Sequence, residues 1–225
     1  MNKKALIVSL IVIVFIASSV FDSREGNLLS VKFGLGKNIH ETAKQSGAPR
    51  YATRNVAGLV SYKLIDLPPE VALVYEFPGY QITSSPIFAF TLYADEDSNN
   101  NLAVEAASLQ FNTDAVNSHE SAKDFVEQLI AQFHKGGWKR FVPELCPAVT
   151  GRSSFLDENE QVNQIWNCPL DPKHKIAMDD WMKLMLMTQN YQWIDHGVLA
   201  TLTVGFSDDS RGLHIQSGWS SMISL

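Results

Sequence analysis

Short apolar segments separated by proline, glycine or polar residues place the strongest constraint on the fold of this 225-residue chain. The clearest read GLVSYKLIDL, VALVYEF, IFAFTLYA and LAVEAASLQF and occupy residues 58–67, 71–77, 87–94 and 102–111. The first segment alternates between apolar and polar residues, which is typical of a strand with one buried face, and the others are apolar runs of strand length. Because the connections are short, they favour hairpins over crossover helices. The sequence therefore predicts an antiparallel meander.

The second half of the chain predicts two helices. In residues 121–135, Phe125, Leu129 and Phe133 recur at helical spacing, serines precede the run, and two glycines follow it. Residues 179–187 begin with aspartates and carry Trp181 among methionines on one side, which indicates a second helix.

Other segments complete the expected architecture. Strands are predicted at residues 138–145 and 197–206 and a hairpin at 151–168, whereas the stretch from residue 207 has no clear pattern. The predicted fold class is α+β, with one antiparallel sheet of about six to eight strands and two main helices packed on one of its faces.

An apolar run at residues 5–21 follows Lys3 and Lys4 and contains only three polar side chains, all serines. As a helix it would be about 26 Å long, near the lower limit for crossing a bilayer. Residues 1–22 are therefore predicted to form a membrane-anchor helix in the inner membrane, with the rest of the chain in the periplasm of a bacterium. The alternative is a signal peptide cleaved after Ser19, which would release a soluble periplasmic domain.

The remainder divides into two parts. Residues 23–56 are polar and glycine-rich and predict a spacer with weak structure, except for a strand near 28–34 and a short helix near 39–45. Residues 57–225 are predicted to form a single exported domain, since no internal linker or repeat is visible.

The net charge of the exported part limits the classes of partner that it can bind. Without Lys3 and Lys4, 16 basic residues face 24 acidic ones, a formal charge of −8. Such a balance argues against nucleic acid and anionic membrane surfaces and permits a basic protein partner.

Cys146 and Cys168 are the only two cysteines, and both follow the apolar run. An even pair without C-x-x-C spacing in an exported chain predicts a structural disulfide. The bridge would close a loop of about 22 residues.

No common catalytic signature is present: the chain lacks S-x-x-K, G-x-S-x-G, H-E-x-x-H, P-loop and G-x-G-x-x-G motifs. The six histidines are scattered rather than spaced as metal ligands. We therefore predict no catalytic residues, no metal ion and no cofactor. If the chain were a hydrolase, His174, Asp195, His196 and Cys146 would be the first suspects, although neighbours on a strand point to opposite faces.

The loop DEDSNNN resembles a calcium-binding loop in part. Asp95, Asp97, Asn99 and Asn101 match ligand positions 1, 3, 5 and 7 of an EF-hand. However, the glycine at position 6 and the closing glutamate are missing, so a polar hairpin tip is the favoured interpretation. Asp95, Glu96 and Asp97 are instead candidate partner-binding residues.

Five tryptophans and several methionines gather mainly in the second half. Core packing explains most of them, although such residues also line apolar ligand pockets. Trp219 lies in a serine-rich terminus and is a further candidate for partner binding, because tryptophan is enriched at interface hot spots.

Three classes of function follow. The first is a non-enzymatic, membrane-anchored periplasmic protein that binds and neutralises another protein, such as an immunity protein against a toxin delivered to the envelope. The second is an envelope binding module or assembly subunit for an apolar ligand or partner. The third is a hydrolase with an unfamiliar site.

Overall fold

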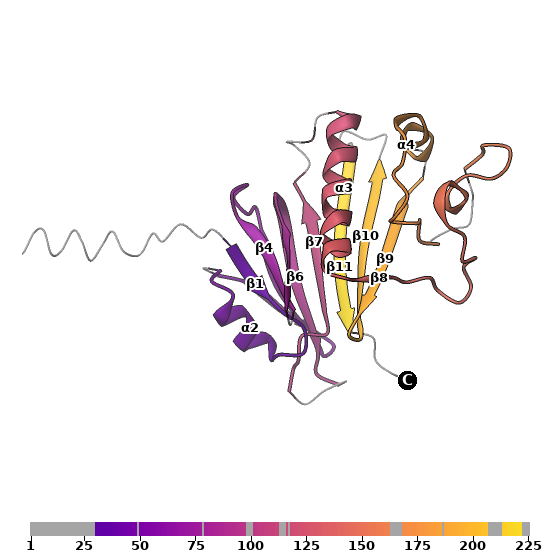
Figure 1. The fold of residues 1–225 in the computed structure, drawn as a ribbon. Coiled ribbons are helices and arrows are strands. Elements are labelled where there is room, and N and C mark those ends of the chain that lie inside the picture. Colours follow the sequence, from indigo (N-terminus) through magenta and orange to yellow (C-terminus); the bar gives the residue numbers. More distant parts are fainter. Residues whose placement is uncertain are drawn as a thin grey trace, which may run out of the picture.

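The computed structural model describes residues 30–48, 50–77, 79–97, 101–112, 116, 118–162, 168–185, 187–206 and 213–221. These residues form two β-sheets and three helices (Figure 1). The predicted mixed α+β class is confirmed. The predicted anchor at residues 5–21 lies outside the described residues.

The larger sheet has eight strands, and every neighbouring pair in it is antiparallel. From one edge to the other its strands are β2 (Ala52–Val56), β3 (Leu59–Ile65), β6 (Ile87–Asp95), β7 (Ala106–Phe111), β11 (Leu213–Ser221), β10 (Val198–Phe206), β9 (Gln189–Asp195) and β8 (Lys139–Arg140). The sheet thus joins three strands of the expected meander, β3, β6 and β7, to strands from later in the chain.

The smaller sheet contains β1 (Ser30–Phe33), β4 (Ala72–Phe77) and β5 (Tyr80–Ser84). Strand β4 is antiparallel to β5 but parallel to β1. The expectation of one meander is therefore wrong for residues 71–77. Two prolines separate β3 from β4, and β4 leaves the large sheet to bury Leu73 and Tyr75 in the core that the two sheets share.

The expected spacer is also wrong over its described part. Residues 30–48 and 50–56 supply β1, helix α2 (Ile39–Gln45) and β2. Val31 and Ile39 are fully buried. The strand and short helix expected in this region are present, and they are integral parts of the folded domain rather than a tether.

Helix α3 (His119–Lys135) confirms the longer helix and begins two residues before its predicted start. Ser118 and Ser121 form a reciprocal capping box, in which each hydroxyl accepts a hydrogen bond from the other residue's backbone N–H. Helix α4 (Met178–Leu184) corresponds to the second predicted helix but ends earlier.

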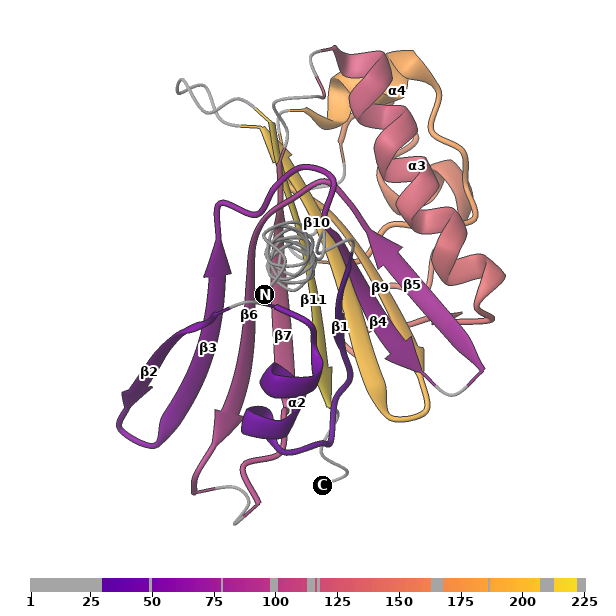
Figure 2. The same cartoon turned by 90° about the vertical axis from the view of Figure 1, so that its left-hand side faces the viewer.

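The core lies on one face of the large sheet. Figure 2 shows the small sheet and α2 in front of its central strands, with α3 and α4 beside them. Phe33 of β1 meets Phe90 of β6 at a ring-centroid distance of 4.8 Å, and Phe133 of α3 stacks on Trp193 of β9 at 4.2 Å. The large sheet, the small sheet and helix α3 therefore share one continuous apolar core.

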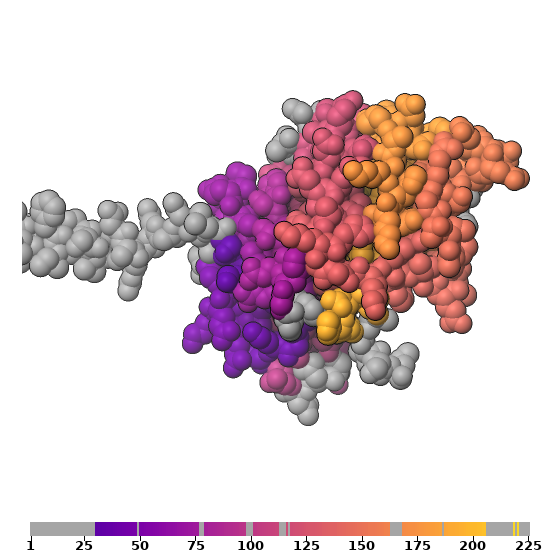
Figure 3. Space-filling view, in the orientation of Figure 1, coloured from indigo at the N-terminus to yellow at the C-terminus, as the bar shows by residue number. Residues whose placement is uncertain are grey.

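The segment 141–177, here called the disulfide lobe, differs from the predicted strand and hairpin. Of the expected strand, Lys139–Arg140 pairs with β9, and Phe141 adds one backbone hydrogen bond to Gln192. The described part of the expected hairpin contains a 3₁₀ turn at Gly151–Ser154 and an antiparallel bridge between Leu156 and Val162, and residues 163–167 of its return limb lie outside the described residues. Figure 3 shows this lobe at one side of the molecule, away from the N-terminal strands.

Candidate partner-binding surface

Asp95, Glu96 and Asp97, which we call the acidic corner, lie at the end of β6 beside the turn between β2 and β3. The backbone N–H of Glu96 donates to the carbonyl of Gly58 at 3.0 Å, and that of Asp97 donates to the Asp95 carboxylate at 2.8 Å. Asn55 of β2 donates its side-chain amide to Glu96 Oε1 at 2.8 Å. Two hydrogen bonds therefore attach the corner to the β2–β3 hairpin, and the third fixes the corner internally.

The hairpin turn explains this geometry. Ala57 and Gly58 are its two loop residues and have φ values of 50° and 84°, as a tight turn between right-twisted strands requires. A side chain at Gly58 would also lie 3.3 Å from the Asp97 carboxylate. Glycine at this position thus allows the acidic corner to approach the hairpin.

Two aliphatic side chains border the acidic corner. Val56 and Leu59 are paired across the hairpin and are 49% and 47% exposed. Glu96 and Asp97 are exposed and form no ion pair with any described residue. Exposed carboxylates next to exposed aliphatic groups can attract a basic protein and then bury apolar area against it.

The face of the large sheet that looks away from the core continues this surface. On β3, Val60 and Leu64 are buried, whereas Ile65 on the opposite face is 55% exposed. Across β2, β3 and β6 this outer face forms a shallow hollow that includes Ser61 and Tyr93. The hollow reaches Val56 and Leu59, so it adjoins the acidic corner.

The calcium interpretation gains nothing from the structure. Asp95 Oδ1 accepts a backbone hydrogen bond, and the carbonyl of Asn101 accepts one from Asn38 at 2.7 Å. Asn99 lies outside the described residues. In the part of the chain that the structure describes, no group of three or more His, Cys, Asp or Glu residues is placed to hold a metal ion.

The four hydrolase suspects lie in two separate segments, Asp195 and His196 at the end of β9 and Cys146 and His174 in the disulfide lobe. His196 contacts Asp195 at 2.8 Å, because His196 lies in the turn before β10 and not on the strand. Its side chain is 70% exposed. Cys146 is disulfide-bonded, and His174 lies in the disulfide lobe beside the ring of Phe155.

The predicted disulfide is confirmed: Cys146 and Cys168 are bonded, with their Cα atoms 5.5 Å apart. The guanidinium of Arg140 lies next to the bridge and donates to the carbonyls of Val149 and Pro169, each at 2.7 Å. Arg140 therefore attaches both limbs of the disulfide lobe to the edge of the large sheet.

Two buried carboxylates, those of Asp171 and Asp180, accept hydrogen bonds that hold the rest of the disulfide lobe in place. Arg152 forms a two-pronged bond to the buried Asp180 of α4, at 2.8 Å to each oxygen, and this holds the pKa of Asp180 below its usual value. Burial raises the pKa of Asp171, but backbone N–H bonds from Gly151 and Lys173 outweigh that effect, and the net shift is downward. Both carboxylates therefore have structural partners.

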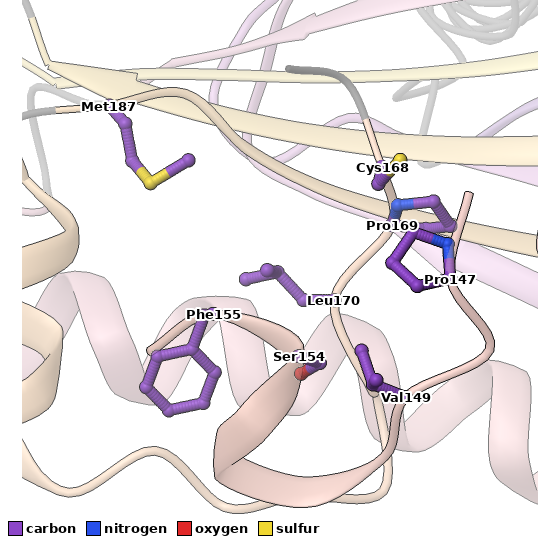
Figure 4. Close-up of a pocket in the computed structure, with 8 residues that line it drawn as sticks. All are labelled: Pro147, Val149, Ser154, Phe155, Cys168, Pro169, Leu170 and Met187. Atoms are coloured by element: carbon purple, nitrogen blue, oxygen red, sulfur yellow. The ribbon is translucent and has the colours of Figure 1, made fainter. Parts of the chain in front are cut away.

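Two cavities lie beside the disulfide lobe in the part of the chain that the structure describes. Figure 4 shows a pocket behind the disulfide, where Leu170, Phe155 and Met187 converge, but its volume is only about 20 Å³, room for about one water molecule. A wider groove between α3 and residues 172–175 has charged walls that include Glu127 and Lys173.

The tryptophans confirm the packing interpretation where their side chains are described. Trp138, Trp181 and Trp193 are at most 4% exposed. Trp219 lies on β11 between β7 and β10, in register with Ala107 and Ala200. Its part in partner binding stays a prediction.

No protein-family model, curated protein or solved structure matches this chain. Among the described residues, no helix is both long enough and apolar enough to cross a membrane.

Proposed function

We propose that this chain is a non-enzymatic periplasmic protein, held at the inner membrane by residues 5–21, that binds and neutralises a basic protein. An immunity protein against a toxin delivered to the envelope is the role that fits best. The observation that carries this proposal is the acidic corner, where exposed Glu96 and Asp97 are hydrogen-bonded to the hairpin that presents exposed Val56 and Leu59.

Charge and preorganisation both support the proposal. Exposed carboxylates that form no ion pair with a described residue accelerate encounter with a basic partner, and the formal charge of −8 behind the anchor adds to that attraction. Because hydrogen bonds already fix the corner, binding would cost little conformational entropy. Neutralising a toxin needs only such a surface and no catalytic group.

The double variant Glu96→Lys/Asp97→Lys tests this function. The tagged full-length chain is purified from native membranes, and we expect the wild type to recover one basic protein in near-stoichiometric amount. Reversing two charges should weaken that binding at least about tenfold, because the new lysines repel a basic partner. Titration of the recovered protein onto each purified variant measures the change.

A matched control reverses two exposed carboxylates in the disulfide lobe, Glu144→Lys/Glu158→Lys, and alters the net charge equally. The control should bind as the wild type does. Recovery of lipid alone by the wild type, or equal weakening by both double variants, would contradict the proposal.

A further inference from the structure

Both edges of the small sheet are occupied by other groups of the chain. At β5, the side-chain amide of Gln132 from α3 accepts from the N–H of Thr83 at 2.9 Å and donates to its carbonyl at 2.8 Å, as a neighbouring strand would. At β1, the N–H of Lys32 donates to the carbonyl of Ser46 at 3.0 Å. These contacts satisfy backbone groups that would otherwise offer a pairing edge.

One edge of the large sheet is protected in a different way. Strand β8 is only two residues long, and Arg140 attaches it to the disulfide lobe. Very short edge strands are a common protection against pairing with another chain.

The other edge, β2, has none of these protections. All five of its residues are exposed, it contains no proline, and its register with β3 is uninterrupted. No described residue pairs with its outer side. It forms the free margin of the large sheet in Figure 2.

The hairpin fixes which backbone groups of β2 are free. Val56 and Leu59 flank a two-residue turn and form a hydrogen-bonded pair. Pairs alternate along an antiparallel ladder, so Arg54 also bonds to β3, while the N–H and C=O groups of Thr53 and Asn55 point outward. Strand β2 therefore offers two donors and two acceptors in strand geometry.

We propose that β2 receives an extended segment of the basic partner as a ninth strand of the large sheet. This inference rests on the proposed function and specifies how its partner binds. The acidic corner lies at the Val56 end of β2, so the added strand should carry Lys or Arg at that end and an apolar side chain beside Val56.

Charge disfavours a second copy of this chain at the same edge. Symmetric pairing of β2 with itself over all five residues places Arg54 opposite Arg54 of the other copy. Like charges directly opposite each other destabilise a strand pair. A basic partner strand is instead drawn to the adjoining carboxylates.

Thr53→Pro tests the inference in the full-length protein. Proline removes the outward N–H of Thr53 and is tolerated at sheet edges, so the β2–β3 ladder should survive. Thr53→Ala is the matched control, since it removes the side chain and keeps the N–H. Against the basic protein recovered by the wild type, we expect binding at least about tenfold weaker for Thr53→Pro and unchanged for Thr53→Ala.

Amide hydrogen exchange of the wild-type protein supplies a second readout that needs no variant. The Thr53 and Asn55 amides should exchange freely in the isolated chain and become protected in the complex. Binding by Thr53→Pro at wild-type strength, or no protection of these amides, would overturn strand addition and leave the proposed function standing.

Two further results would also overturn the inference. If the wild type recovers no basic protein, both the inference and the proposed function fail. If the wild type alone is a dimer that Thr53→Pro separates, then a second copy occupies the edge.

Discussion

Replacing Trp193 by alanine is expected to lower the free energy of unfolding by about 3–5 kcal/mol. The indole is fully buried on β9 and stacks on Phe133 of α3 with ring planes 5° apart. Tyr191, which is 1% exposed on the same strand, packs beside it. The substitution would leave a cavity where the helix meets the sheet, and this layer cannot collapse without moving α3. Urea denaturation measures the loss.

Met182→Ala provides the comparison for Trp193→Ala. Met182 is a large apolar residue on α4 but is 44% exposed, so its truncation should cost less than about 1 kcal/mol. Equal losses in the two variants would show that the contact between α3 and β9 does not organise the core.

Removing the disulfide is expected to lower the free energy of unfolding by about 3 kcal/mol. The bridge joins residues 22 positions apart in the sequence. The double variant Cys146→Ser/Cys168→Ser has no bridge, so its unfolded chain has the conformational entropy that the closed loop excludes in the wild type. The surrounding lobe has little regular structure of its own, so it depends on the bridge and on Arg140.

The reductant-treated wild type is the control for the cysteine variant. Reduction should shift the urea midpoint of the wild type to that of Cys146→Ser/Cys168→Ser and leave the variant itself unchanged. A wild-type midpoint that does not respond to reductant would show that the lobe is held without the bridge.

Local patterns predicted the elements whose signals lie within a few residues. Helix α3 was found because its caps and apolar spacing agree, and β3, β6, β7 and β10 were found because one face of each is apolar. Strands β9 and β11 were missed. Strand β9 places Gln189 in the core, and β11 is rich in serine, so neither shows a simple alternation.

The pairing of β1 with β4 could not be predicted from local pattern. Some forty residues separate Ser30 from its partner Ala72, and a parallel pair leaves no hairpin signal in the sequence. Treating residues 23–56 as a spacer followed from their polar composition. Their few apolar residues, such as Val31 and Ile39, are nevertheless buried in the core.

The candidate site was predicted in part. Asp95, Glu96 and Asp97 stand out as a charged run, and the structure places them together beside the β2–β3 turn. The open edge at β2 was missed, because whether a strand lies at an edge depends on the topology of the whole sheet. The protected edges at β5 and β8 likewise depend on residues distant in sequence, Gln132 and the disulfide lobe.

The proposed function requires above all that the folded domain works outside the cytoplasm. Trapping thiols in intact native cells with a maleimide that adds mass tests this claim most directly. If the domain is exported, Cys146 and Cys168 are bonded in the cell and react only after a reductant has been added. Immediate labelling of both cysteines in the cytoplasmic fraction, without any reductant, would contradict the claim.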